Sequence, residues 1–120
     1  MTIQSNECDL RVTASPGDDP VIIEGDLTRH NAAEFERRMR ALNADPSRAV
    51  TLDLSGLDID DGVALATAIN SLRQLLNRSA KIILTGAPQM LCHNLYRLGL
   101  LDAGGAVELV DMRLDEPAGF

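Results

Sequence analysis

Two spacings of apolar residues alternate along the chain, and they predict strands and helices in turn. Residues 7–14 carry apolar and polar side chains at alternate positions, the pattern of a strand with one face in water. Residues 16–20 are rich in proline, glycine and aspartate, which favours a turn, and Val21–Glu24 then resumes the strand pattern. We therefore expect a hairpin whose second strand ends at Gly25.

The segment after this hairpin has the spacing of a helix. Asn31 is a favoured N-cap residue, and Glu34 follows it at the distance of a capping box. Apolar residues then recur every three or four positions, which predicts one buried stripe. The stripe consists of Ala32, Phe35, Met39 and Leu42.

The remainder of the chain alternates between strands and helices. Ala49–Leu54 is mostly apolar, which predicts a central strand covered on both faces, and Lys81–Thr85 predicts another buried strand, ended by Gly86. Val107–Val110 is expected to form a last short strand.

Two further helices are expected between these strands. One runs from Asp61 to Asn77, and its predicted core stripe is Leu65, Ile69, Leu72 and Leu76. The other has Pro88 in its first turn and Gly99 as a left-handed C-terminal cap. Its predicted core residues are Met90, Leu91, Leu95 and Leu98.

The order β-β-α-β-α-β-α-β predicts an α/β fold. Strands that alternate with helices pair in parallel through right-handed crossovers, so we expect a mixed, mostly parallel sheet with one antiparallel strand from the N-terminal hairpin. The helices are expected to pack against this sheet. The length of 120 residues fits a single domain over residues 1–120, with a core at about 8–112 and a loose C-terminal tail at 113–120.

Composition narrows the range of partners. The net charge of −7 repels phosphate backbones and anionic membrane surfaces, and an aromatic content of 2% leaves no stacking platform for bases. Nucleic acid and direct membrane insertion are therefore not expected, and the lack of a leader pattern in residues 1–15 predicts a cytoplasmic protein. Cys8 and Cys92 are predicted to be small buried residues and not a disulfide.

Three segments resemble the STAS fold of anti-sigma factor antagonists. They are Gly25-Asp26-Leu27-Thr28 before the first helix, Val50-Thr-Leu-Asp-Leu-Ser-Gly-Leu57, and Leu95-Tyr-Arg-Leu-Gly-Leu-Leu101. The resemblance covers about residues 8–112 and implies a STAS-like domain that docks onto another protein. In the best-known branch, that partner is an anti-sigma factor with serine-kinase activity, and phosphorylation of the antagonist ends the binding.

The resemblance therefore implies a non-enzymatic regulatory module whose partner is an anti-sigma factor or another regulatory protein. The alternative is a cytoplasmic STAS subunit of a lipid- or anion-transport complex, docked on a transporter ATPase subunit. A homodimer is a further option. No cofactor is expected, since the chain has neither a phosphate-binding glycine loop nor a dinucleotide fingerprint.

The family's phosphate acceptor, a Ser or Thr after an Asp, has no counterpart in this chain. Alignment without a gap from Asp53 places the acceptor on Gly62, and a one-residue deletion places it on Asp61. Neither residue has a hydroxyl group, so phosphorylation is not expected here. Ser55 is the only substitute acceptor considered, and it is a weak one. It resembles the structural serine of the family's Asp-Leu-Ser-Gly turn, which implies a hydrogen-bonding role in its own loop.

Acidic residues crowd around the start of the second helix. Asp53, Asp58, Asp60 and Asp61 could in principle hold Mg²⁺, but the preferred interpretation is that Asp60 or Asp61 caps the helix while the others are solvated. His30 and His93 lack metal-ligand spacing, so no metal or catalytic site is predicted.

The predicted partner-binding surface has three parts. They are the loop Asp26–His30, the loop Ser55–Gly62, and the exposed face of the second helix, where small residues would leave a flat surface. The candidate contacts are Asp26, Thr28, Arg29, His30, Ser55, Asp58, Asp60, Asp61, Gly62, Ala66, Asn70 and Arg73.

Overall fold

The computed structural model describes residues 10–14, 20–101 and 107–113. The elements follow the predicted order. They are β1 (Arg11–Thr13), β2 (Val21–Leu27), α1 (Ala32–Arg40), β3 (Ala49–Ile59), α2 (Gly62–Leu76), β4 (Lys81–Pro88), α3 (Gln89–Arg97) and β5 (Val107–Arg113).

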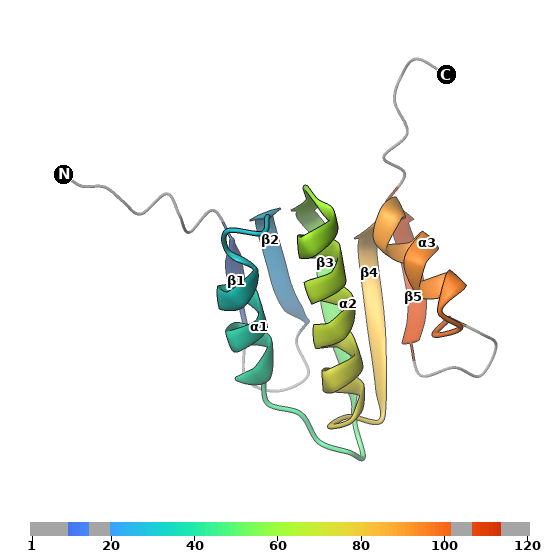
Figure 1. Ribbon diagram of the computed structural model, residues 1–120. Helices are drawn as coiled ribbons and strands as arrows, with labels where there is room; N and C mark the ends of the chain where they lie inside the picture. The colour runs from blue at the N-terminus through green and yellow to red at the C-terminus, as the bar shows by residue number, and fades with distance from the viewer. Residues whose placement is uncertain (1–9, 15–19, 102–106, 114–120) are drawn as a thin grey trace.

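The strands form one five-stranded sheet in the order β1-β2-β3-β4-β5. β1 pairs antiparallel with β2, and every later pair is parallel. Since each parallel strand lies beside its predecessor, right-handed crossovers place all the connecting helices on the same side. Figure 1 shows α1, α2 and α3 side by side over one face of the sheet. The predicted α/β fold with a mixed, mostly parallel sheet is confirmed.

None of the helices in the described residues lies on the other face of the sheet, so the prediction that β3 is covered on both faces is wrong. Leu52 and Leu54 of β3 are buried, whereas Thr51 and Asp53 alternate with them and are only half-buried. Ion pairs lie across strands on this open face. They are Arg11–Glu24 at 3.4 Å and Lys81–Glu108 at 2.5 Å.

Most of the strands are longer than the sequence pattern predicts. Gly25 does not end β2: with a φ of 110° it stays in the strand and pairs with Leu57 of β3. Gly86, with a φ of 66°, likewise lies within β4. β3 continues to Ile59 and β2 to Leu27, so the first parts of the predicted loops Ser55–Gly62 and Asp26–His30 are strand and not loop. These strands are extended by parallel pairing with a neighbouring strand. The local pattern of residues cannot predict this pairing, because the neighbouring strand lies elsewhere in the sequence.

The core confirms the predicted phase of α1 and corrects that of α2 and α3. The whole α1 stripe is buried. In α2, the fully buried side chains are Ala64, Ala68, Ser71, Leu72 and Leu75, while Leu65, Ile69 and Leu76 are only partly buried. In α3, Leu91 and Leu95 are buried as predicted, but Met90 and Leu98 are exposed.

The end of α3 follows its prediction. Gly99 has a φ of 77°, its N–H donates to the Tyr96 carbonyl at 3.0 Å, and the Leu100 N–H donates to the Leu95 carbonyl at 3.0 Å. This pair of bonds is the Schellman motif, which uses a left-handed residue to satisfy the last helical carbonyls. Cys92 is buried, as expected.

Several predictions fall on residues that the structure does not describe. They concern Cys8, the start of the first strand at residues 7–9, most of the turn at 16–20, and the tail from residue 114. Residue 113, which was predicted to begin that tail, is the last residue of β5.

Candidate functional site

The candidate site is built around the N-terminus of α2, where Asp61 is the N-cap residue. One carboxylate oxygen, Oδ1, accepts a hydrogen bond from the Ala64 N–H at 2.8 Å, and the other, Oδ2, accepts one from the Arg29 N–H at 3.0 Å. These two backbone hydrogen bonds lower the pKa of Asp61, the one from Ala64 most strongly. The predicted capping role is confirmed for Asp61, which also ties α2 to the segment before α1.

That segment is held by side chains in a way the sequence did not indicate. Asn31 is the N-cap residue of α1, but its side chain makes no cap hydrogen bond to the helix. Its Oδ1 instead accepts from the Thr28 N–H at 2.8 Å, and its Nδ2 donates to the Asp26 carbonyl at 2.8 Å. Glu34 pairs with Arg37 and Arg38 in place of a capping box. Asn31 therefore shapes the segment leading into α1.

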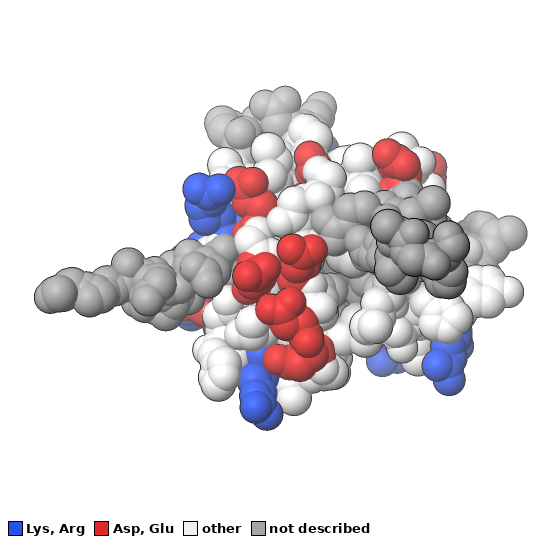
Figure 2. Space-filling view, turned by 90° about the horizontal axis from the view of Figure 1, so that it is seen from above, with Lys and Arg blue, Asp and Glu red and all other residues white. Residues whose placement is uncertain are grey.

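The ends of β2 and β3 bring four carboxylates to one edge of the sheet. Asp26 and Asp58 are partners in the parallel register, and the Asp60 N–H donates to the Leu27 carbonyl at 3.0 Å. Figure 2 shows acidic side chains gathered in the middle of this end of the molecule. Desolvation, followed by the charges of Asp26, Asp58 and Asp61, raises the pKa of Asp60.

This acidic edge is not assembled as a metal site. Within the described residues, no group of three or more His, Cys, Asp or Glu side chains is arranged to hold a metal ion. His30 and His93 are exposed. Asp53, which the sequence grouped with the other acids, instead bonds to Ser55.

Ser55 forms hydrogen bonds with Asp53, which lies two residues before it in β3. Its hydroxyl donates to Asp53 Oδ1 at 2.6 Å and its N–H donates to the same oxygen at 3.0 Å, which lowers the pKa of Asp53. Gly86 passes so close that a Cβ atom built on it would lie 2.7 Å from the Ser55 Cβ. Ser55 therefore makes local structural contacts, as the sequence predicts, but it makes them within β3 and not in a turn.

The outer face of α2 is exposed along its whole length. Gly62, Ala66, Asn70 and Arg73 all lie on this face and are all exposed, in agreement with the predicted orientation. No atom would lie within 4 Å of a Cβ built on Gly62. The helix therefore presents a face that has no large side chain over its first two turns along this line.

Two features of the site were missed by sequence reasoning. Val63 is 53% exposed beside the outer face of α2, and it could have been recognised because it lies off both the predicted and the observed core stripe. The bridging role of Asn31 had no sequence signal beyond its residue type, because its two partners are backbone groups of the preceding segment.

The fold and site together define a small α/β domain with an exposed helix face and a hydrogen-bonded helix start. The chain belongs to the STAS domain family: the family model described as Mlab, STAS domain matches residues 10–111. The resemblance found in the sequence is thus confirmed. STAS domains are regulatory interaction modules and are generally non-catalytic.

A comparison with curated proteins gave no match. Within the described residues, no helix combines the length and the apolar character needed to cross a membrane.

Proposed function

We propose that this chain is a non-enzymatic docking module that binds a regulatory protein, such as an anti-sigma factor, through α2 and the segments that precede α1 and α2. The observation that carries the proposal is the exposed face Gly62–Ala66–Asn70–Arg73 on a helix whose start is already fixed. A surface ordered before binding loses less conformational entropy when a partner docks.

The start of α2 also bears on regulation. Residues 61 and 62 are Asp and Gly, so neither register of the family motif supplies a hydroxyl group at the family's acceptor position. The Asp61 carboxylate already occupies the anion-favouring end of the helix. We therefore infer that docking does not depend on phosphorylation at this position and is controlled by expression level or by a second protein.

A second function is favoured by one observation. The matching family model is named for Mlab and not for an anti-sigma factor antagonist. The alternative role, a subunit of a lipid- or anion-transport complex docked on a transporter ATPase, uses the same helix face and differs in the partner.

Affinity capture from the native host tests both roles. The wild-type chain is compared with Ala66→Arg, which places a long charged side chain on the outer face of α2. The matched control is Ala33→Arg, because Ala33 is an exposed alanine of α1. We expect a protein that is captured by the wild type and the control and is lost with Ala66→Arg.

Mass spectrometry then separates the two functions. A kinase-like anti-sigma factor supports the first, and a transporter ATPase supports the second. If every captured protein is retained equally by Ala66→Arg, the outer face of α2 is not the docking surface and the proposal is wrong.

A further inference from the structure

Charged residues are distributed unevenly over the molecule. Asp26, Asp58, Asp60 and Asp61 gather at the ends of β2 and β3. Figure 2 shows a group of acidic side chains at this end of the molecule. Further acids lie on the open face of the sheet. In contrast, α2 and α3 contain no acidic residue. Their only Lys or Arg residues are Arg73 and Arg97, and both are exposed.

The three arginines of α1 share ion pairs with two glutamates of the same helix, whereas α2 and α3 have no acidic residue to pair with their arginines. Glu34 pairs with Arg37 and with Arg38, and Glu36 pairs with Arg40 at 3.1 Å. Arg73 and Arg97 form no ion pair with any residue in the part of the chain that the structure describes. In a protein of net charge −7, two exposed arginines on helices that contain no acidic residue, with no ion pair to a described residue, make this part of the described surface positive.

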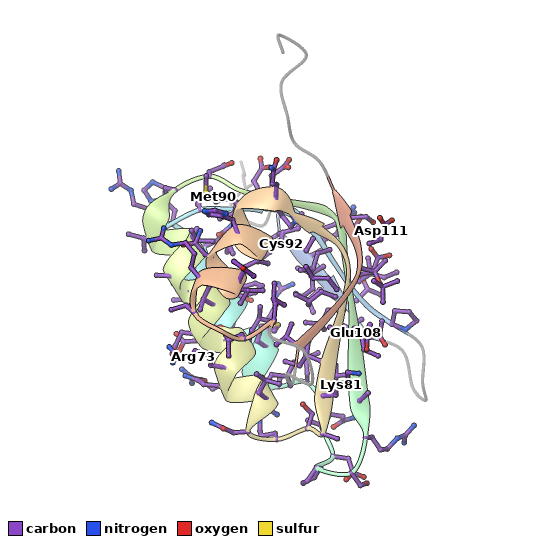
Figure 3. All side chains as sticks on the ribbon, turned by 90° about the vertical axis from the view of Figure 1, so that its right-hand side faces the viewer. Arg73, Lys81, Met90, Cys92, Glu108 and Asp111 are labelled. Carbon is purple, nitrogen blue, oxygen red and sulfur yellow. The ribbon has the colours of Figure 1, made fainter. Side chains whose placement is uncertain are left out.

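The two arginines lie at similar depths along neighbouring helices. α2 and α3 follow β3 and β4, which are parallel, so both helices start at the same end of the sheet, as Figure 1 shows. Arg73 lies roughly 16 Å from the start of α2 and Arg97 roughly 12 Å from the start of α3, at 1.5 Å per residue. Figure 3 shows α2 and α3 together on the same side of the sheet.

Apolar side chains accompany these cations. On α3 and its C-cap, Met90, Tyr96 and Leu98 are all at least half exposed. On the helical wheel, Met90 and Arg97 share a line, because residues seven apart lie on the same face. We define the α2–α3 surface as Asn70, Arg73, Met90, His93 and Arg97, which are all exposed.

We propose that the α2–α3 surface receives an acidic segment of a partner protein, in which carboxylates meet Arg73 and Arg97 and apolar side chains cover Met90. The inference rests on the proposed docking function of α2 and specifies the chemistry of its partner. Complementary charge fixes orientation and speeds association, while buried apolar contact contributes to affinity. An anionic membrane is a weaker fit, since each cation near such a surface contributes only about 1 kcal/mol and the chain as a whole is acidic.

The test uses two synthetic amphipathic peptides of about 16 residues, long enough to form a helix. Both carry the same leucine stripe, which is flanked by Glu in one peptide and by Lys in the other. Amide chemical shifts of the full chain are followed during titration. We expect the Glu peptide to shift the amides of Asn70, Arg73, His93 and Arg97, with affinity that falls as salt is raised.

Variants establish the role of the two arginines. The double variant Arg73→Glu/Arg97→Glu should weaken binding of the Glu peptide by about tenfold or more. The neutral double variant Arg73→Gln/Arg97→Gln should also lower the affinity for the Glu peptide, by a smaller factor. It provides the test if Arg73→Glu/Arg97→Glu does not fold. The matched control Arg37→Glu/Arg40→Glu makes the same charge change on α1 and should leave the affinity within about twofold.

The inference is overturned if the Glu peptide does not bind or maps to another face, or if the Lys peptide binds the α2–α3 surface equally well. Binding of phosphatidylserine vesicles with the same dependence on Arg73 and Arg97 would also overturn it, in favour of a membrane. The capture experiment separates this inference from the docking function. If a partner is lost with Ala66→Arg but retained by Arg73→Glu/Arg97→Glu, the docking function stands and the claim that the partner segment is acidic is refuted.

Discussion

Replacement of Leu95 by alanine tests the packing of α3 onto the sheet. The Leu95 side chain is 0% exposed and belongs to the central cluster of buried residues. A buried Leu→Ala change costs about 2–5 kcal/mol, from the lost transfer free energy and the cavity that remains. α3 has nine residues and only Leu91, Cys92 and Leu95 are buried in it, so it can shift to fill part of the cavity. We therefore expect a loss of about 2–3 kcal/mol.

Leu98 supplies the matched control within the same segment. Sequence periodicity placed both leucines in the core, but Leu98 is 50% exposed. Leu98→Ala should therefore change the free energy of unfolding by less than about 0.5 kcal/mol, as surface substitutions usually do. The Schellman bonds from Gly99 and Leu100 use backbone atoms, so neither substitution removes them.

Urea denaturation followed by circular dichroism measures the difference. With a slope of roughly 1–3 kcal/mol per molar urea, the midpoint for Leu95→Ala should fall by roughly 0.7–3 M while the slope stays constant. A loss below about 1 kcal/mol for Leu95→Ala, or an equal loss for Leu98→Ala, would refute the orientation of α3 described here.

Three further predictions follow from the site. Gly86→Ala should destabilise the chain by at least about 1–2 kcal/mol, because Gly86 has a φ of 66° and a Cβ there would lie 2.7 Å from the Ser55 Cβ, whereas Gly62→Ala, with open space around it, should be neutral or stabilising in the same urea assay. Hydrogen bonds lower the pKa of Asp61 below its value in the unfolded chain. The ionised Asp61 side chain therefore contributes to the free energy of unfolding above about pH 4, and this contribution is lost as the pH falls through the folded pKa. Acid titration of stability should therefore be shallower in Asp61→Asn, and an unchanged slope would contradict this. Incubation with a cognate kinase and ATP should add no phosphate by intact mass. Asp61→Ser should gain a phosphorylatable site under the gapped alignment and none under the ungapped one, and a stoichiometric phosphate on the native chain that weakens partner binding would refute regulation without phosphorylation.

The pattern of residue types was enough to predict the order of the elements and where several of them begin or end. The α1 stripe, the Asp61 cap, the left-handed Gly99 and the exposed line from Gly62 to Arg73 were all predicted correctly. These features depend on contacts within about one helical turn, so the spacing of residue types is enough to specify them.

The way in which these elements meet depends on contacts between residues far apart in the sequence. Gly25 stays in β2 because Leu57 pairs with it, and the Asn31 side chain reaches the backbone of residues 26 and 28 in place of its own helix. The segments before α1 and α2 come together through the bond from the Arg29 N–H to Asp61, which lies 32 residues further on. Met90 and Leu98 fit a helical stripe by spacing, yet they are exposed, because the position of the sheet beneath α3 selects which side of that stripe is buried. Strand register and the final rotation of α2 and α3 depend on partners distant in sequence, which the spacing of residue types does not reveal.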